Sequence, residues 1–411
     1  MNSPSSSAPS DSVVSTPKPP SKRPDIRPSK SFQIKNQRQN SATVLLKKEN
    51  DVSFLSVFPA AFLGLALGLS GCGKAWKLML DSFNYHNDII SGVEGAFETL
   101  ALAILFTYML KIVLYGKEVL KELSLVETQA GACAMTMSAA SIASFYAKFF
   151  PTLCLTVWWT CLVGHILMAI WNFKIRWELF KKLTQSGKSF IEGIYCPIAL
   201  PTVGIAMMAA TSGSFGVLEH EIGFALFWNA AVFCVILQPL LAYRMFCVDE
   251  KTLNPTLMPT FFIYNAPVAL VSATYFNLGH PSKEVSIFLF CFQLLSTFLF
   301  LFFAPKIWGT RFTPVWSAAT FPTIVSAMSC IGFAIQMDGE NHLIMIFSFC
   351  FLSLASIAVL VIMALAGIWM WHKLDDEGLV PISPPTSPQQ ILSPPISPRA
   401  QGKLGGFIEL M

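Results

Sequence analysis

Charged residues are scarce in this sequence of 411 residues, which is 54% hydrophobic and only 13% charged. Soluble domains carry about 25% charged residues, so the composition excludes an ordinary soluble protein. It indicates an integral membrane protein. The formal net charge of +4 is small and comes largely from the first fifty residues.

Sequence signatures of catalysis and metal binding are missing as well. The chain has no HExxH, P-loop or nucleophile-elbow motif. None of its ten cysteines forms a CxxC pair, and most of them fall in apolar runs. We interpret the cysteines as small packing residues. We therefore expect no enzymatic activity, no cofactor and no metal site.

Two tails differ in composition from the rest of the chain. Residues 1–50 are rich in Ser, Pro and basic side chains, and residues 373–411 are rich in Pro and Ser. Such segments bury too little apolar surface to fold, so we expect two disordered cytoplasmic tails. No apolar run precedes Ser53, which argues against a cleaved secretory signal and leaves a transit peptide as the alternative.

Both tails carry candidate phosphorylation sites, where phosphate would reverse the local charge. Four serines precede prolines near the C-terminus and two lie in the basic RPSKS segment: Ser383, Ser387, Ser393, Ser397, Ser29 and Ser31. The Pro-rich segment also suits docking of SH3-like or WW-like partners as a polyproline II helix. Regulation and docking both stay open.

Apolar windows of about 20 residues predict membrane spans. Residues 51–372 form one transmembrane domain with ten such windows, at 53–76, 93–116, 130–149, 151–173, 194–214, 220–243, 256–277, 284–305, 313–334 and 342–371. Lys and Arg gather before the first window and in every second connection, with Lys148 and Lys283 as exceptions. The positive-inside rule then predicts a multi-pass protein with both termini in the cytoplasm.

Small residues and prolines alternate with bulky residues from one window to the next. The odd-numbered windows are rich in Gly, Ala, Ser and Pro, whereas the even-numbered ones are rich in aromatic and branched residues. Small residues suit close helix packing or a cavity wall, and bulky apolar residues suit lipid. The alternation predicts an all-α protein of five helical hairpins, with five odd helices around a central pore and five even helices outside. Tight packing without a pore is the alternative.

The stretch RFTPVWSAATFPTIVSAMSC, from Arg311 to Cys330, is the strongest candidate for a pore wall. Pro314 and Pro322 each remove a helix hydrogen bond, and an irregular backbone at membrane depth requires cover by protein or a watery cavity. Phe321, directly before Pro322, is a candidate plug of the pore. Its alternative role is that of an ordinary core aromatic. Prolines of the odd windows are candidate kinks in pore helices: Pro59, Pro201, Pro267 and Pro322.

Three stretches resemble the family of TehA, slow anion channels and malic-acid transporters. They are the pattern FP…F.G…GLS from Phe58 to Ser70, the segment from Leu253 to Ala273, and the segment from Phe312 to Ala327. The resemblance covers residues 53–371 and is strongest in the seventh to ninth windows. This sequence departs from the family in its third window, which lacks a proline often seen there, and in the connection after the fourth.

The resemblance implies homotrimers in which the five odd helices of each protomer line its own pore. It also implies that a Phe of the ninth helix occludes the pore, a role that falls on Phe321. We expect a channel for small anions such as chloride or nitrate, in the plasma membrane or an organellar membrane, with kinases acting on the tails. The alternatives are a proton-linked malate or other C4-dicarboxylate carrier, a sulfite transporter, and a non-transporting scaffold or receptor.

Cations are expected only at the ends of the odd helices, where Arg311 and Lys148 would attract anions to the pore mouths. The ordinary positive-inside distribution explains the same pattern. Glu94 and Glu98 lie one helical turn apart, where they could bind a cation or proton; we expect them to be solvated at the interface or paired with Lys148. His165, in an even window, is expected to be a hydrogen-bonded packing residue.

Overall fold

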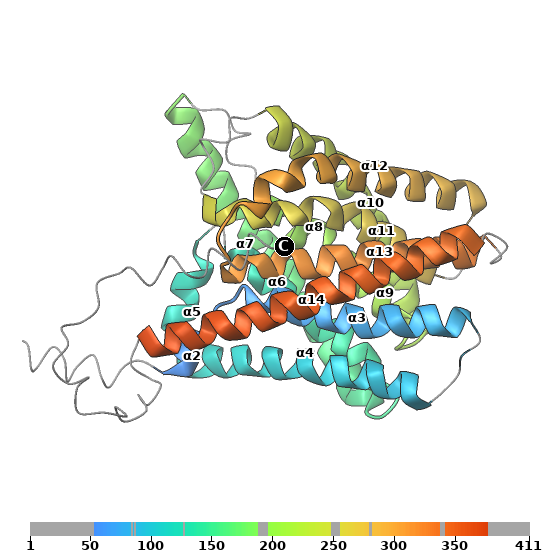
Figure 1. Cartoon of the computed structure of the whole chain (residues 1–411). Coiled ribbons are helices and arrows are strands. Elements are labelled where there is room, and N and C mark those ends of the chain that lie inside the picture. The colour runs from blue at the N-terminus through green and yellow to red at the C-terminus, as the bar shows by residue number, and fades with distance from the viewer. Residues whose placement is uncertain are drawn as a thin grey trace, which may run out of the picture. The chain divides into compact units, whose positions relative to one another are not determined.

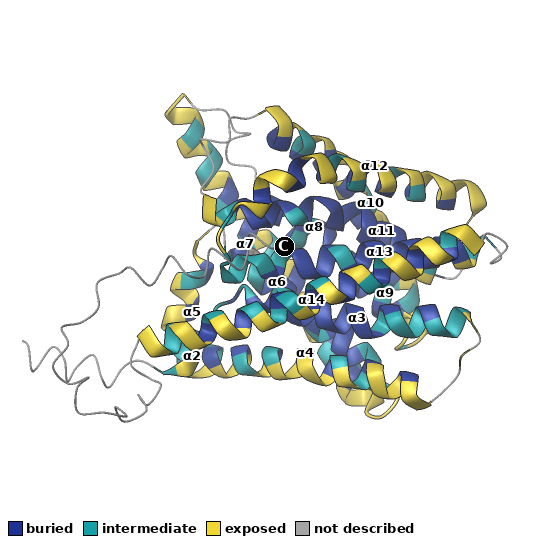
Figure 2. Ribbon diagram, in the orientation of Figure 1, coloured by how far each residue is buried: buried dark blue, intermediate teal, exposed yellow. Residues whose placement is uncertain are grey.

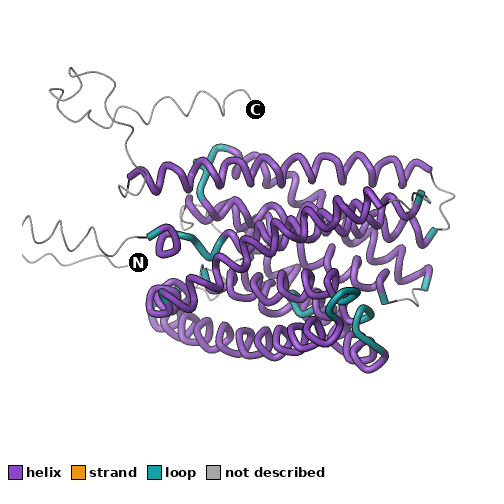
Figure 3. The backbone as a smooth tube through the Cα atoms, turned by 90° about the horizontal axis from the view of Figure 1, so that it is seen from below, coloured by secondary structure: helices purple, strands orange, loops and turns teal. Residues whose placement is uncertain are grey.

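The computed structural model describes residues 53–83, 85, 88–125, 128–187, 196–247, 255–278, 282–337 and 342–376, all of which belong to one compact unit that begins at Ser53. The six candidate phosphorylation serines lie outside the described residues. Every regular element in the described part is a helix, as Figure 3 shows. The helices lie along a common axis, and successive membrane-length segments reverse direction (Figure 1).

Five long, unbroken helices form the outside of the bundle. They are α4 (Asp88–Leu114), α7 (Pro151–Gln185), α10 (Val217–Cys247), α12 (Lys283–Trp308) and α14 (His342–Asp376). Only 28–33% of their most apolar stretches is buried, and Figure 2 shows their outer faces as exposed. Many of the exposed residues on these helices are large and apolar. These five helices coincide with the even-numbered windows. Their exposed apolar faces are suited to contact with lipid.

The odd-numbered windows form the interior. They contain α2 (Phe54–Val57) with α3 (Phe62–Ser82); α6 (Gln129–Tyr146); η2 (Cys196–Ile198) with α8 (Ala199–Val203) and α9 (Ala206–Ser212); η4 (Pro255–Asn265) with α11 (Ala266–Asn277); and η5 (Pro314–Ala319) with α13 (Thr320–Gln336). In the segments Pro255–Asn277 and Pro314–Gln336, 83% and 78% of the most apolar stretch is buried. One short helix, α5 (Gly116–Leu123), follows α4.

Seven described segments are long and apolar enough to cross a membrane: the five outer helices, Pro255–Asn277 and Pro314–Gln336. The other three windows contain helices that are too short or too polar to meet this criterion of length and hydropathy. The helix α3 carries Lys74, Lys77 and Asp81, and the helical segment Cys196–Ser212 is short. Helix α6 consists largely of small residues such as Ala, Ser and Gly.

Prolines lie where the inner segments change their helical form. Pro59 lies in the link between α2 and α3, Pro201 lies in the short α8, Pro267 lies in the first turn of α11, and Pro322 lies in the first turn of α13. Because proline cannot donate a backbone hydrogen bond, a helix that contains one leaves a carbonyl group free. Three of these breaks follow 3-10 helices, η2, η4 and η5, and all four prolines lie in segments that other helices cover.

Candidate functional site

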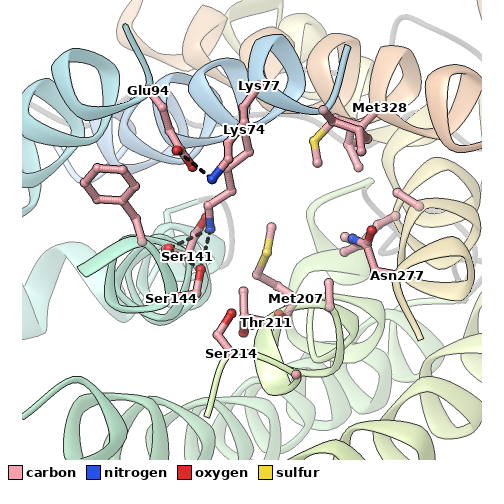
Figure 4. A pocket seen from close by; sticks show the side chains of 18 of the residues that line it. Lys74, Lys77, Glu94, Ser141, Ser144, Met207, Thr211, Ser214, Asn277 and Met328 are labelled. Carbon is pink, nitrogen blue, oxygen red and sulfur yellow. Dashed lines mark hydrogen bonds and ion pairs between the residues drawn. The ribbon is translucent and has the colours of Figure 1, made fainter. Parts of the chain in front are cut away.

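A cavity of about 540 Å³ opens at the end of the bundle where α3 ends and α4 begins (Figure 4). Its lining comes from each of the five inner segments and from one residue of α4, Glu94. The polar and charged part of the wall consists of Lys74, Lys77, Asp81, Glu94, Ser141, Ser144, Lys148, Thr211, Ser214 and Asn277. The inner segments that sequence alternation grouped together therefore share one cavity.

Each inner helix contributes one face to this cavity at helical spacing. From α13 the face consists of Phe321, Val325 and Met328, and from α11 it includes Leu270 and Ala273. The five inner segments run in the same direction, and the cavity opens near their C-terminal ends. The first residue that each segment contributes to the lining therefore lies deepest in the cavity. Phe321 is therefore part of its floor.

Phe321 is 4% exposed and belongs to a buried apolar cluster that includes Leu67, Met207 and Leu270. Its ring thus lies between the open cavity and a packed interior. This position suits both functions considered for Phe321, a plug and a core aromatic. The interior is therefore hollow at this end of the bundle, whereas a continuous pore, as opposed to tight packing, stays a prediction.

Lys74 is the most strongly held cation of the cavity. Its ammonium group donates to the Ser141 carbonyl oxygen at 2.6 Å, to Ser141 Oγ at 2.8 Å and to Ser144 Oγ at 2.6 Å. The same nitrogen lies 3.9 Å from Glu98 Oε1. These contacts join α3, α4 and α6 on one side of the cavity.

Glu94 and Glu98 differ from the sequence expectation. Both are buried, at 4% and 0% exposure, and they pair with cations of α3: Glu94 with Lys77 at 3.2 Å and Glu98 with Lys74. The expectation of solvated carboxylates, or of a pair with Lys148, is therefore wrong. Helix α3 continues to Ser82, six residues past the predicted end of its window, and this extension places its lysines opposite α4.

Lys74 and Lys77 are candidate site residues that the sequence prediction missed, because it considered only Arg311 and Lys148 as cations near the pore. A signal was present. Two lysines spaced by three residues precede two glutamates spaced by four residues, on consecutive segments of one hairpin. Residues three or four apart share a helix face, so this pattern predicts two ion pairs between neighbouring antiparallel helices.

The two predicted mouth cations lie apart. Lys148 lines the cavity, with its ammonium group over the rings of Phe145 at 4.4 Å and Phe149 at 5.0 Å. Arg311 precedes η5, at the opposite end of the segment that continues into α13, and does not line this cavity. His165 is fully buried, and its Nδ1 lies 2.8 Å from Thr136 Oγ1, as expected for a hydrogen-bonded packing residue.

A hydrogen-bonded brace fixes the segment that carries Phe321. Asn265 Nδ2 donates to Ser326 Oγ at 2.7 Å, and Ser326 Oγ donates to the Pro322 carbonyl at 2.7 Å. From α12, Gln293 Nε2 donates to the Ser326 carbonyl at 2.9 Å. Buried polar groups of this kind hold neighbouring helices in register. These hydrogen bonds tie the backbone that follows Phe321 to Asn265 at the end of η4 and to Gln293 of α12.

The cavity combines ammonium groups, hydroxyl groups and an apolar floor. Its wall carries three cationic and two anionic side chains, and Glu98 adds a third carboxylate behind it. Among the described residues, no group of three or more His, Cys, Asp or Glu side chains could hold a metal ion. The wall can contact a small, partly hydrated anion without a dense cluster of positive charge.

Comparison with known proteins gives consistent results. A family model described as voltage-dependent anion channel matches residues 57–366. The chain is 23% identical over 358 residues to the S-type anion channel SLAH2 of Arabidopsis thaliana, and 21% identical over 357 residues to the guard cell S-type anion channel SLAC1 of the same plant. Both alignments cover 82% of this chain, which spans 63% and 60% of the length of these two relatives.

Proposed function

The chain belongs to the voltage-dependent anion channel family, and from this premise we propose that it passes small anions such as chloride or nitrate through the cavity and past Phe321. One observation carries the proposal: five helical segments separated in the sequence each supply one face of the same cavity, and Phe321 is part of its lining. The polar wall can replace part of the hydration of an anion. The apolar floor can block its passage.

The proposal includes the architecture and orientation of the protein. Ten membrane-crossing segments, arranged as five hairpins with both termini in the cytoplasm, would place the ends of α3, α6, α9 and α11 on the outer side. The cavity would then be an outer vestibule, and Lys148 would be part of its mouth. We further propose the plasma membrane as the location, a homotrimer as the assembly, and a protein kinase as the regulator of the tails.

Phe321 is proposed as the gate because a ring at the floor of a vestibule can close a narrow passage by contact. A change of side-chain rotamer would open the passage without movement of the braced backbone. In this scheme the hydroxyl and ammonium groups of the wall bind anions weakly, because the three lysines of the wall also have carboxylate, hydroxyl or aromatic partners. Weak binding favours rapid release, which conduction requires.

The test is anion flux through purified full-length protein reconstituted in liposomes. Phe321→Ala should raise chloride flux above that of the wild type. The matched control is Phe333→Ala, because Phe333 is on the same helix, is similarly buried at 6% exposure and stacks on Phe290 away from the cavity lining. That control should leave the wild-type flux unchanged at equal protein incorporation.

Three results would contradict the proposal in different ways. Equal flux through wild type and Phe321→Ala would exclude the gate. Saturable uptake driven by a pH gradient, without passive current, would favour the proton-linked carrier. The absence of flux in both proteins, with correct folding shown by a single symmetrical elution peak, would favour a scaffold or receptor.

A further inference from the structure

A chain of hydrogen bonds leads from the cavity to a fully buried carboxylate. Lys74, whose side chain is 19% exposed, donates from Nζ to Ser141 Oγ at 2.8 Å. Ser141 Oγ lies 2.7 Å from Ser70 Oγ, and Ser70 Oγ donates to Glu98 Oε1 at 2.9 Å. An ammonium group only donates, and an ionised carboxylate only accepts. All the hydrogens along this chain therefore point from the cavity toward Glu98.

Glu98 is poorly compensated for a buried carboxylate. It is 0% exposed, and the ammonium group of Lys74, at 3.9 Å, lies beyond hydrogen-bond distance. Its second oxygen, Oε2, has no hydrogen-bond partner among the described residues. Burial of an ionised carboxylate without full compensation is costly, and ionisable groups at such positions in membrane proteins often relay protons. The geometry thus favours uptake of a proton by Glu98.

We propose that Glu98 is a proton-binding site linked to an anion-binding site at Lys74, an inference that rests on the proposed conduction of small anions. Lys74 would pass a proton to the Ser141 hydroxyl group. Ser141 would then pass its hydroxyl proton to Ser70, and Ser70 would pass its hydroxyl proton to Glu98. Lys74 regains a proton from a hydronium ion in the cavity, which becomes water. One proton has then moved from the cavity to Glu98, and the ammonium group is restored.

The linkage follows from charge. When Glu98 is ionised, it compensates the charge of Lys74 and repels an anion in the cavity. When Glu98 is protonated, the Lys74 ammonium group attracts a chloride or nitrate ion or a small carboxylate. Lower pH on the cavity side therefore strengthens anion binding, and bound anion strengthens proton binding by the same factor.

The other charged groups around this cavity are not connected to Glu98 by the hydrogen-bond chain. Lys77 of α3 pairs with Glu94 of α4, and Lys148 of α6 lies over two aromatic rings. Asp81 lies at the open end of the α3 face. Glu94 is ion-paired closely, at 3.2 Å, and lies outside the hydrogen-bond chain. The proposal assigns the pH dependence to Glu98 and not to Glu94.

The first experiment measures the chloride concentration that gives half-maximal flux through reconstituted full-length protein, at mildly acidic and mildly alkaline pH on the cavity side. Removal of one negative charge close to the bound anion should lower this concentration by roughly tenfold. Glu98→Gln should give the low value at both pH values. Glu94→Gln, the matched control one turn earlier on the same helix, should keep the pH dependence.

A second measurement does not need flux. Chloride is added to purified protein in weakly buffered detergent solution, and a pH indicator reports proton uptake. Wild type and Glu94→Gln should take up protons, and Glu98→Gln should not. Proton uptake without any liposome flux would contradict the proposed conduction and support the linked site. No proton uptake by wild type, or equal uptake by Glu98→Gln, would overturn the linked site whatever the flux.

Discussion

Thr320 of α13 lies directly against Gly68 of α3. A Cβ atom at Gly68 would lie 2.5 Å from Thr320 Oγ1 and 2.6 Å from Thr320 Cβ, closer than such atoms can approach. The same threonine donates from Oγ1 to the Gly64 carbonyl at 2.9 Å. Gly64 and Gly68, one helical turn apart in α3, therefore permit close contact between α3 and α13, while Gly71 is part of the cavity lining.

This contact predicts that Gly68→Ala destabilises the protein, although Ala is the better helix former by about 1 kcal/mol. Overpacking of a tight contact costs about 1–3 kcal/mol, and here the clash includes the threonine Cβ and backbone. The loss should appear as a lower midpoint of thermal unfolding in detergent. Gly367→Ala in α14 is the control, because its added Cβ would meet nothing within 4 Å. It should not lower the midpoint; equal losses would contradict the tight contact between α3 and α13 as the cause.

The stability of the protein is expected to depend strongly on Glu122, which holds together the break in the helix beside Pro59. Glu122 Oε2 accepts from Lys111 Nζ at 2.8 Å, and Glu122 Oε1 accepts from the Ala60 backbone at 2.7 Å. Lys111 also donates to the Phe58 carbonyl at 2.6 Å. The Lys111 side chain is 5% exposed and that of Glu122 is 18% exposed, so Glu122→Ala leaves a buried ammonium group without its carboxylate. Because such a loss costs about 3–5 kcal/mol in a fully buried pair, Glu122→Ala should clearly reduce thermal stability.

The control for Glu122 is the pair between Glu178 and Lys181, at 3.1 Å, whose side chains are about half exposed. Exposed pairs contribute about 0–1 kcal/mol, so Glu178→Ala should change the unfolding midpoint little. If both substitutions had the same small effect, Glu122 would not hold the break between α2 and α3 together.

Chemical labelling tests the orientation of the cavity. Ser214→Cys lies in the cavity wall and should react with a membrane-impermeant thiol reagent added outside intact cells, whereas Ser212→Cys, which is 0% exposed, should not. The exposed Cys247, Cys291 and Cys350 are replaced by Ser beforehand to remove background. Labelling of Ser214→Cys only from the cytoplasmic side would reverse the proposed orientation.

The size of the side chain at position 321 should set the anion conductance. Conductance is expected to rise from Trp to Phe to Leu to Ala, because a smaller side chain leaves a wider passage. Each decrease of about 1.4 kcal/mol in the barrier would raise the rate about tenfold. Single-channel or macroscopic current, normalised to surface protein, measures this order. Conductance that does not depend on side-chain size would assign Phe321 to the packed core.

Sequence periodicity predicted the positions of the helices, but the sequence did not predict the buried ion pairs of Lys74 and Lys77. Helices lie at all ten predicted windows, because a long apolar run allows few other structures. Lys74 and Lys77 were missed because one lies at the end of the first window and the other just beyond it, where lysines are common. Whether such a lysine faces solvent or a neighbouring helix depends on helix length, and α3 continues to Ser82.

The sequence alone determined the class of protein, the positions of its helices and the division into small-residue and bulky segments, because these follow from local composition and period. Only the tertiary structure decided which faces meet. It placed Phe321 at the floor of a cavity, separated Arg311 from Lys148, and joined Lys74 to Glu98 through Ser141 and Ser70. Those relationships depend on the rotation and depth of each helix. Hydropathy does not encode either one, because small residues suit a tight contact and a cavity wall equally well.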